Sequence, residues 1–492
     1  MNAESIIFII YLVFMLGIGI YFFLRDKNAS DKGYFLGGRQ MGAWVTALSA
    51  GASDMSAWVL MGLPAAIYEA GMGKTWIAIG LLIGYAVSWF VVAPRLRSFT
   101  IAAGDSITVP QYLTNRFLSK SRSLQLICAL VFLVAYTIYS ASSIKACSTL
   151  FHMVLGMRPM TASTIAAVII IGYTFLGGFN AVCWTDFFQG LLMLGALLCA
   201  PIVAVFVLDK PQTAALPAHF WSFLSTGSAS WKSFADILTG LGWGLGYFGM
   251  PHIIVRFMSL RSGRELKKSR RIGIGWTLLI LLFSVAAACV GRIFIPDAED
   301  SSVFFIMLVR KIFSGSGLGL ITGLLLSAIL AASMSTPDSQ LLAASSSFTC
   351  DVYEPILRKG KAGAKESAWV GRLIVALIAI VAYIIVAVDK TSTIMGLVEN
   401  AWGVFGAAFG PVILLSLFWK RFTYRGAVAG IVAGAAVDII WLAALTGVTG
   451  IYEIIPGFAV SLAAGVIVSR LDKAPSKEVE AIFERGVATV DD

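Results

Sequence analysis

Charged residues are scarce in this sequence. Asp, Glu, Lys and Arg make up only 13% of its 492 residues, whereas 58% are hydrophobic and the mean hydropathy is +0.85. A soluble globular protein carries roughly 25% charged residues, so one soluble core cannot absorb this apolar surplus. We therefore predict an integral membrane protein. Because hydrophobic stretches recur along almost the whole chain, no soluble module is expected.

The residues of common catalytic and metal sites are also few. The three histidines are isolated, the six cysteines are scattered without a CxxC pair, and a Walker motif is missing. This pattern argues against a zinc site, a disulfide framework and nucleotide hydrolysis. The net charge of +10 lies in short loops between apolar stretches, which is typical of membrane topology. We predict that the protein is not an enzyme, that it has no cofactor, and that it has neither a nucleic-acid partner nor an obligatory protein partner.

Long apolar stretches, in contrast, are abundant. A membrane-spanning helix needs roughly 20 such residues, and this rule predicts an all-α polytopic protein with about 13 transmembrane helices. We expect them at residues 4–24, 43–70, 75–94, 123–151, 159–178, 181–208, 233–255, 272–294, 317–349, 367–388, 393–419, 426–446 and 455–469. The chain then forms one transmembrane domain, residues 1–471, followed by a cytoplasmic tail, residues 472–492, whose segment 476–485 could form an amphipathic helix.

Basic residues alternate between the predicted loops. Most of the 37 lysines and arginines fall in every second loop, and Lys145 is left inside a span. Cytoplasmic loops carry the excess of positive charge, so we predict an external N-terminus and a cytoplasmic C-terminus in a bacterial inner membrane. The first apolar run lacks a basic leader and a cleavage site before Arg25, which favours a retained span over a signal peptide.

The second predicted span contains groups that a lipid-facing helix avoids. Residues 51–55, Gly-Ala-Ser-Asp-Met, place Asp54 near the bilayer centre, where a carboxylate costs about 2.5–3.5 kcal/mol on insertion scales. Small residues allow the helix to unwind, and the freed carbonyls together with Asp54 could bind a small hard cation. Tight helix packing would also use small residues, but it does not require Asp54. We predict the ion and substrate site here.

Alternate glycines interrupt another predicted span at residues 240–252. They precede Pro251 and surround Trp243 and Tyr247. Interrupted segments at corresponding positions of two transporter halves mark binding sites. We therefore predict that Trp243 and Asp54 are counterparts in two inverted repeats. A glycine-rich packing face is the alternative.

A third segment, residues 327–339, carries hydroxyls and another carboxylate. Ser335 and Thr336 could bind a cation, and Ser335, Asp338 and Ser339 share one helix face at positions i, i+3 and i+4. Pro337 removes a helix hydrogen bond and frees a carbonyl nearby. The hydroxyls could instead bond within the helix, which would leave Asp338 unexplained.

Two further charges, Lys145 and Asp186, need partners within the membrane. We predict that Lys145 pairs with Asp338 or Asp186 inside the bundle. Asp186 could instead stand at a helix N-terminus, where the helix dipole favours a carboxylate.

Short motifs are spread along nearly the whole chain, and their order in the sequence is informative. They include Gly37-Gly38-Arg39, residues 46–56 (TALSAGASDMS), Trp184-Thr185-Asp186, residues 242–249 (GWGLGYFG), Met334-Ser335-Thr336 and residues 405–411 (FGAAFGP). In this order the chain resembles the sodium/solute symporter family, and most closely its bacterial sodium/proline symporters. The resemblance implies a leucine-transporter-type core of two inverted five-helix repeats, residues 43–208 and 233–419, with an extra span at 4–24 and two more within 426–469.

The resemblance also implies the site residues. Sodium is expected between the second and ninth spans, at the carbonyls of Ala52, Met55 and Ala332, the hydroxyls of Ser335 and Thr336, and the carboxylate of Asp54. The implied substrate site contains Ser56, Ala57, Trp58, Tyr139, Trp243, Tyr247 and Pro251. We assign coupling or a second cation site to Arg39, Lys145, Asp186, Asp338 and Ser339.

The function implied by the resemblance is secondary active symport, with sodium as the coupling ion. Inward sodium flow would drive L-proline uptake by alternating access, and a potential of 100 mV supplies about 2.3 kcal/mol per charge. Ala57, Lys145, Met250 and Asp338 depart from the pattern of the proline symporters. Three alternatives therefore stay open. The substrate could be another small amino acid or an organic solute, the coupling ion could be a proton acting through Lys145 and Asp338, or the protein could be a transporter-like sensor.

Overall fold

Continuous apolar runs fold into long helices, because backbone groups in lipid must be satisfied within their own segment. The computed structural model describes residues 3–26, 30–208, 216–296, 298, 300–313, 318–389 and 391–490. Within these ranges, 11 helices are long and apolar enough to cross a membrane. They span Ala3–Arg25, Met72–Ala102, Ser123–Leu155, Pro159–Leu176, Phe179–Val207, Gly263–Phe294, Gly319–Leu357, Ala364–Val388, Ile394–Phe418, Tyr424–Ala444 and Ile454–Leu471.

The all-α prediction is confirmed, and each of these long helices coincides with a predicted span. The other two predicted spans, 43–70 and 233–255, are the interrupted segments that contain Asp54 and Trp243. Each is divided into short helices, so neither meets a length criterion for crossing a membrane. The total of thirteen spans stays a prediction.

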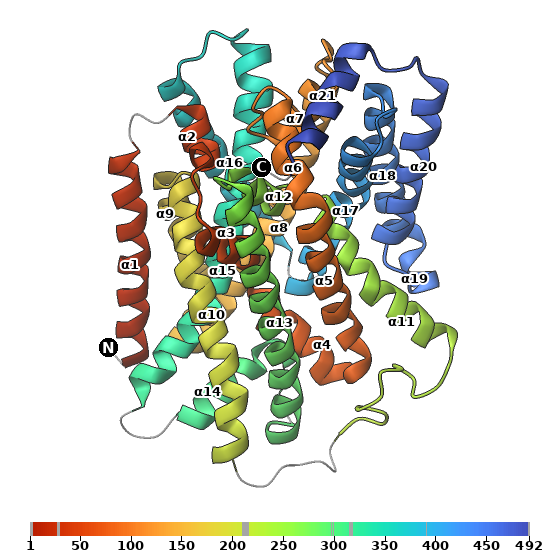
Figure 1. Cartoon of the computed structure of the whole chain (residues 1–492). Helices are drawn as coiled ribbons and strands as arrows, with labels where there is room; N and C mark the ends of the chain where they lie inside the picture. Colours follow the sequence, from red (N-terminus) through yellow and green to blue (C-terminus); the bar gives the residue numbers. More distant parts are fainter. Residues whose placement is uncertain are drawn as a thin grey trace.

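The helices of the first half carry the labels of Figure 1. They are α1 (Ala3–Arg25), α2 (Asp31–Leu36), α3 (Ala43–Ala52), α4 (Gly62–Ala70), α5 (Trp76–Val87), α6 (Ala93–Ala102), α7 (Val109–Arg116), α8 (Ser123–Leu155), α9 (Pro159–Leu176) and α10 (Phe179–Val207).

The second half contains the remaining labelled helices. They are α11 (Trp231–Gly242), α12 (Pro251–Ser259), α13 (Gly263–Phe294), α14 (Phe304–Phe313), α15 (Gly319–Ser347), α16 (Ala364–Val388), α17 (Ile394–Phe418), α18 (Tyr424–Ala444), α19 (Thr446–Thr449), α20 (Ile454–Leu471) and α21 (Lys477–Ala488).

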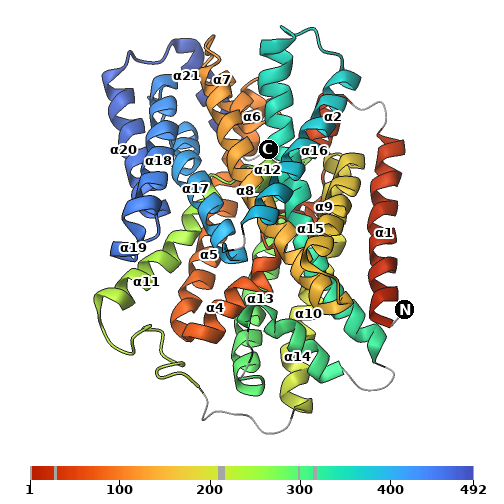
Figure 2. The ribbon, with the colours of Figure 1, turned by 180° about the vertical axis from the view of Figure 1, so that it is seen from behind.

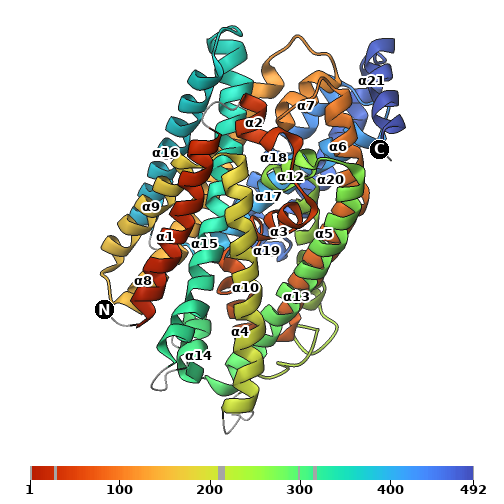
Figure 3. The same ribbon diagram turned by 60° about the vertical axis from the view of Figure 1, so that its left-hand side comes forward.

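The broken helices lie at the centre of the bundle. Helix α3 packs against α10 and α13, and α15 packs against α8 and α10. At one edge, α1 contacts α10 and α15 (Figure 3), whereas α18 and α20 pack on α17 at the opposite edge (Figure 2). Helix α1 begins at one end of the bundle and α21 lies at the other (Figure 1), as expected for an odd number of crossings. The predicted amphipathic tail helix is confirmed, because α21 buries Val479, Ile482 and Gly486.

A glycine near the end of α3 lets this helix pack closely on α13 just before the break. A Cβ on Gly51 would lie 2.5 Å from the Trp276 ring of α13, so α3 approaches its neighbour only with glycine there. The backbone leaves the helix at residues 53–56 and re-enters a short 3₁₀ turn at Ala57–Val59. Ser56 caps this turn by accepting a hydrogen bond from the Trp58 amide at 3.4 Å.

The glycines of the second break both interrupt the helix and form a packing face, the two roles considered for them. Trp243–Phe248 forms a 3₁₀ segment between α11 and α12, and α12 begins with Pro251, which is favoured at a first helical position. A Cβ on Gly246 would lie 2.1 Å from Nε1 of Trp402 in α17, and one on Gly84 would lie 2.2 Å from the Gly244 carbonyl oxygen. The glycines therefore permit close packing and also weaken the helix.

Candidate functional site

Asp54 joins the two broken segments. Its side chain is fully buried, and its Oδ2 atom accepts a hydrogen bond from the Tyr247 hydroxyl in the second break. The Trp58 indole donates to the Asp54 carbonyl oxygen at 3.1 Å. Oδ1 of Asp54 has no hydrogen-bond partner among the described residues. A buried carboxylate oxygen without a partner is costly, so this atom is a candidate ligand for a cation.

Oxygen atoms from α15 meet the end of α3 beside Asp54. The Ser335 hydroxyl donates to the Ala52 carbonyl at 2.8 Å and approaches the Ala332 carbonyl at 3.3 Å. The Thr336 hydroxyl is fully buried and unpartnered in the described part of the chain. Ser335 therefore bonds across the bundle as well as within its helix. Carbonyl, hydroxyl and carboxylate oxygens are the ligands that hard cations prefer. Met55, also fully buried, lies in the same break.

Aromatic rings cluster around the second break. The Trp243 ring lies 6.4 Å from Trp58, 6.3 Å from Trp402 and 5.2 Å from Tyr452, centroid to centroid. The Tyr247 ring is 5.1 Å from Trp402. Trp402 also donates from its indole to the Trp243 carbonyl at 2.8 Å. We call these five residues the aromatic cage. Trp402 and Tyr452 were not among the predicted site residues, although Trp402 directly precedes a glycine-rich motif.

The other predicted substrate residues border this cage. Ser56 and Ala57 are buried in the first break, and Tyr139 is buried on α8 with its ring 6.3 Å from His252 of α12. The Tyr139 hydroxyl and the Trp243 indole nitrogen lack hydrogen-bond partners within the described ranges. Both groups are buried and unpartnered in the described part of the chain, so they could orient a polar substrate.

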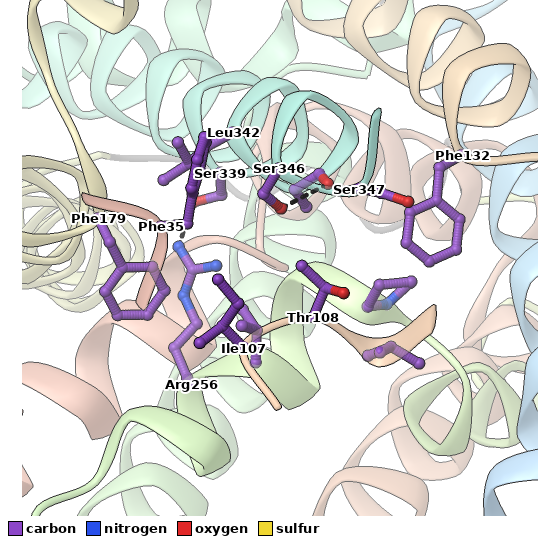
Figure 4. A pocket seen from close by; sticks show the side chains of 14 residues that line it. Phe35, Ile107, Thr108, Phe132, Phe179, Arg256, Ser339, Leu342, Ser346 and Ser347 are labelled. Atoms are coloured by element: carbon purple, nitrogen blue, oxygen red, sulfur yellow. Dashed lines mark hydrogen bonds between the residues drawn. The ribbon is translucent and has the colours of Figure 1, made fainter. Parts of the chain in front are cut away.

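A small cavity begins at Pro251 and extends along α12 and α15 (Figure 4). Arg256 projects into it between Phe179 and Ser339, with the guanidinium 5.4 Å from the Phe179 ring and donating to the Ser339 hydroxyl. Thr108 and Ser347 also line this cavity. The predicted residues Pro251 and Ser339 therefore share one cavity.

Arg256 is the buried partner of Asp186, and sequence reasoning missed it. Nη2 of Arg256 lies 3.2 Å from Oδ2 of Asp186, with both side chains 1% exposed or less. Ser49 of α3 donates to the same carboxylate oxygen at 2.7 Å. The predicted span 233–255 ended one residue before Arg256, which placed this arginine in a cytoplasmic loop. Asp186 lies inside α10, several residues beyond its start at Phe179, so the helix N-terminus alternative is wrong.

The predicted pairing of Lys145 with Asp186 or Asp338 is wrong. Its ammonium group donates to the Ser392 carbonyl in the loop between α16 and α17. The side chain lines a separate cavity of about 750 Å³, together with Asp300, Asp389 and His152. The physical reason is that Arg256 already neutralises Asp186, while the long lysine side chain reaches the end of the bundle.

Asp338 lies on α15 without a cationic hydrogen-bond partner in the described structure. Its Oδ1 atom accepts from the Ser339 amide at 2.6 Å, and its Oδ2 atom is unpartnered. The Ser339 hydroxyl approaches Oδ2 of Asp186 at 3.3 Å. Asp186, Asp338 and Ser339 are thus brought together, with Arg256 among them.

Arg39 has a different environment from the other predicted coupling residues. It follows two glycines with positive φ angles and donates to Asp105 at 2.8 Å, to the Ser106 carbonyl at 2.8 Å and to the Met258 carbonyl at the end of α12. Partial burial opposes ionisation of Asp105, but Lys32 and Arg39 outweigh it and hold the pKa of this loop carboxyl below its ordinary value. Arg39 therefore ties the loop between α6 and α7 to the end of α12.

Comparisons with known proteins agree with this geometry. Residues 34–434 match the family described as "SSF: Sodium:solute symporter family". The "High-affinity proline transporter PutP" of Bacillus subtilis (strain 168) is 45% identical over 480 residues, covering 95% of this chain and 98% of the relative. A "Sodium/proline symporter" of Staphylococcus aureus (strain NCTC 8325 / PS 47) is 43% identical over 497 residues, covering 97% of this chain and 95% of the relative.

Two solved structures share the fold. A Na⁺-coupled sialic acid symporter in a substrate-bound outward-open state superposes with a TM-score of 0.80 at 21% identity, covering 97% of this chain and 99% of that one. Mhp1, a nucleobase-cation-symport-1 family transporter in a closed conformation, gives a TM-score of 0.56 at 13% identity, covering 93% and 99%. The fold is of the leucine-transporter type. This multi-pass membrane protein belongs to the sodium:solute symporter family.

Proposed function

We propose that this protein is a secondary active symporter that couples inward sodium flow to the uptake of L-proline by alternating access. One observation carries the proposal: the Ser335 hydroxyl donates to the Ala52 carbonyl at 2.8 Å, two residues before Asp54, whose Oδ1 atom has no partner among the described residues. Two relatives named as proline transporters, at 45% and 43% identity over nearly the whole chain, support proline as the substrate.

Asp54 is the residue through which ion and substrate would influence each other. Its carboxylate follows Ala52, which Ser335 of α15 contacts, by two residues, and it accepts a hydrogen bond from the Tyr247 hydroxyl of the aromatic cage. A cation bound at Oδ1 would hold the α3 break against α15, which belongs to the other predicted repeat. This stabilises one arrangement of the two repeats, and a ligand shifts such an equilibrium only through its differential affinity.

The aromatic cage and its unpartnered groups suit a small zwitterion with an apolar ring. Trp58, Trp243 and Tyr247 offer ring faces for a pyrrolidine, while the Tyr139 hydroxyl and the Trp243 indole nitrogen offer hydrogen bonds. We further propose a bacterial inner-membrane location, with the N-terminus outside and the C-terminus cytoplasmic. The alternation of basic loops supports this orientation.

Uptake into proteoliposomes tests the function directly. The purified protein is reconstituted and given labelled proline, or a panel of other amino acids and organic solutes, under a sodium, potassium or pH gradient alone. We expect proline accumulation only with an inward sodium gradient. No proline uptake under any gradient would overturn the substrate, and uptake driven by pH without sodium would overturn the coupling ion.

Removing one proposed sodium ligand is expected to weaken sodium dependence without abolishing uptake. In Ser335→Ala, the half-saturating sodium concentration should rise roughly 3- to 10-fold, because a neutral hydrogen-bonding group is worth about 0.5–1.5 kcal/mol. Ser333→Ala is the matched control, because the Ser333 hydroxyl bonds within α15 to the Ile329 carbonyl at 2.7 Å. Equal sodium dependence in the two variants would contradict the assigned ligand.

The position of Lys145 predicts that it has no part in coupling. Lys145→Met should change the rate and the sodium dependence of uptake by no more than about twofold, as for other substitutions away from buried networks. Initial rates measured across sodium and pH gradients decide this. A loss of uptake that is restored by a pH gradient would revive proton coupling through Lys145.

A further inference from the structure

Glycines lie at the contact between α17, α18 and α20, and an aspartate follows them at the same spacing on α18. Gly426, Gly430 and Gly434 follow one another at four-residue spacing on α18, and a Cβ on Gly434 would lie 2.4 Å from the Ala407 carbonyl oxygen of α17. Asp438 occupies the next position of this row and is fully buried. Its carboxylate is therefore held between three helices at the edge of the bundle, where α18 and α20 pack on α17 (Figure 2).

A second buried acid, Glu453, lies against the same glycine of α17 as Asp438. A Cβ placed on Gly403 would lie 2.9 Å from Oδ1 of Asp438 and 3.4 Å from Cγ of Glu453. Glu453 is 1% exposed. Both oxygens of Asp438 and Oε1 of Glu453 lack hydrogen-bond partners in the part of the chain that the structure describes. The other Glu453 oxygen accepts from the Thr446 hydroxyl at 3.1 Å.

Among the described residues, no lysine, arginine or histidine makes a hydrogen bond with the free oxygens of this acid pair. The ionisable groups next to the pair are Glu399 and Tyr452, and Lys74 acts on Glu399. Lys74 at the same end of the bundle pairs with Asp236 at 2.8 Å. Two carboxylates held close together in a low-dielectric interior cannot both ionise without a cation. A hard metal ion takes about six or more oxygen ligands, whereas a proton shared between two carboxyl groups needs only two oxygens. Asp438 and Glu453 offer three free oxygens, which suits a proton better than a metal ion.

We propose that Asp438 and Glu453 form a proton-binding site, in which one protonated carboxyl group donates a hydrogen bond to the other carboxylate. The site lies directly behind the aromatic cage, since Glu453 follows Tyr452 and Gly403 follows Trp402 in the sequence. Loss of the proton places two like charges between the helices that hold these cage residues. The repulsion displaces Tyr452 and Trp402 from Trp243, so substrate affinity falls at alkaline pH.

Infrared spectroscopy tests proton binding without any transport assay. The purified protein in lipid should show a carbonyl stretch from protonated carboxyl groups, and part of this band should be lost in Asp438→Asn and in Glu453→Gln. Asp236→Asn is the matched control: it removes an ion-paired carboxylate at the same end of the bundle and should leave the band unchanged. An unchanged band in both pair variants would overturn the proposal. Loss, on adding sodium at constant pH, of the part of the band that the pair variants lack would also overturn it, because sodium would then replace the proton at the pair.

A second measurement concerns the cage and rests on the proposed function. The KM for proline should rise with pH in the wild type and in Asp236→Asn, and this rise should be lost in both pair variants. A wild-type KM independent of pH would overturn the link between the pair and the cage. If the protein does not transport proline, the infrared result still decides whether the pair holds a proton, so the two failures are distinguishable. Two single variants at different helices guard against one that fails to fold.

Discussion

Replacing Asp54 by Asn is expected to remove most sodium-driven uptake at the sodium concentration that half-saturates the wild type. The asparagine can still accept a hydrogen bond from Tyr247, but it offers no negative charge to a cation at the unpartnered oxygen position. A contact to a charged group is worth roughly 1.5–3 kcal/mol, so sodium affinity should fall about 10- to 100-fold. Sodium titration of proline uptake in proteoliposomes measures this shift directly.

The Tyr247→Phe variant separates charge from hydrogen bonding at the same carboxylate. It removes the donor to Asp54 but keeps the ring that packs on Trp402. We expect it to weaken uptake less than Asp54→Asn and to leave the sodium requirement in place. If Asp54→Asn retains the wild-type sodium dependence, Asp54 is a structural residue and the ion site lies elsewhere.

The second large effect is expected at Arg256. Its replacement by Gln leaves Asp186 as a buried charge without its ion-pair partner, which typically costs about 3–5 kcal/mol. The purified variant should unfold at a clearly lower temperature, as measured by the fraction that remains monodisperse after heating in detergent. The combined variant Arg256→Gln and Asp186→Asn should recover most of this loss, because neither charge then remains unpaired.

An exposed arginine gives the control for Arg256→Gln. Arg261 makes an ion pair with Glu265 on the surface, with its side chain 55% exposed. Arg261→Gln should therefore change stability by no more than about 1 kcal/mol. If the combined variant is no more stable than Arg256→Gln alone, the arginine contributes mainly through its bonds to Ser339 and the His252 carbonyl, and the ion pair is not the dominant interaction.

The broken spans show how far local sequence leads. The mid-span Asp54 and the alternating glycines before Pro251 correctly indicated interruptions, because charge and glycine conflict with a continuous helix in lipid. The facing arrangement of the two breaks, through the bond from Tyr247 to Asp54, depends on residues 193 positions apart. Periodicity within a segment contains no information about such a distant contact. The resemblance to a family supplied the expectation that they meet.

Intramembrane charges show where sequence reasoning failed. Because Lys145 lies inside an apolar stretch, we predicted a buried ion pair for it. Arg256 follows the end of a predicted span and was assigned to a loop. The structure reverses these roles: Arg256 lies 3.2 Å from Asp186, and Lys145 reaches the Ser392 carbonyl. The position of a charge along a helix does not specify which face it occupies or how far its side chain extends, so partner choice is decided by packing.

Composition, span length and the placement of polar residues within apolar stretches determined that this chain is a polytopic helical membrane protein with interrupted segments near residues 54 and 243. These properties follow from the free energy of transferring each segment into lipid, which is local. Only the tertiary structure decided that Arg256 pairs with Asp186, that Trp402 and Tyr452 complete the aromatic cage, and that Asp438 and Glu453 lie against one glycine of α17. Those contacts arise from helix packing. Glycines set how closely two helices approach each other, and side chains that are far apart in the chain then lie together in one buried space.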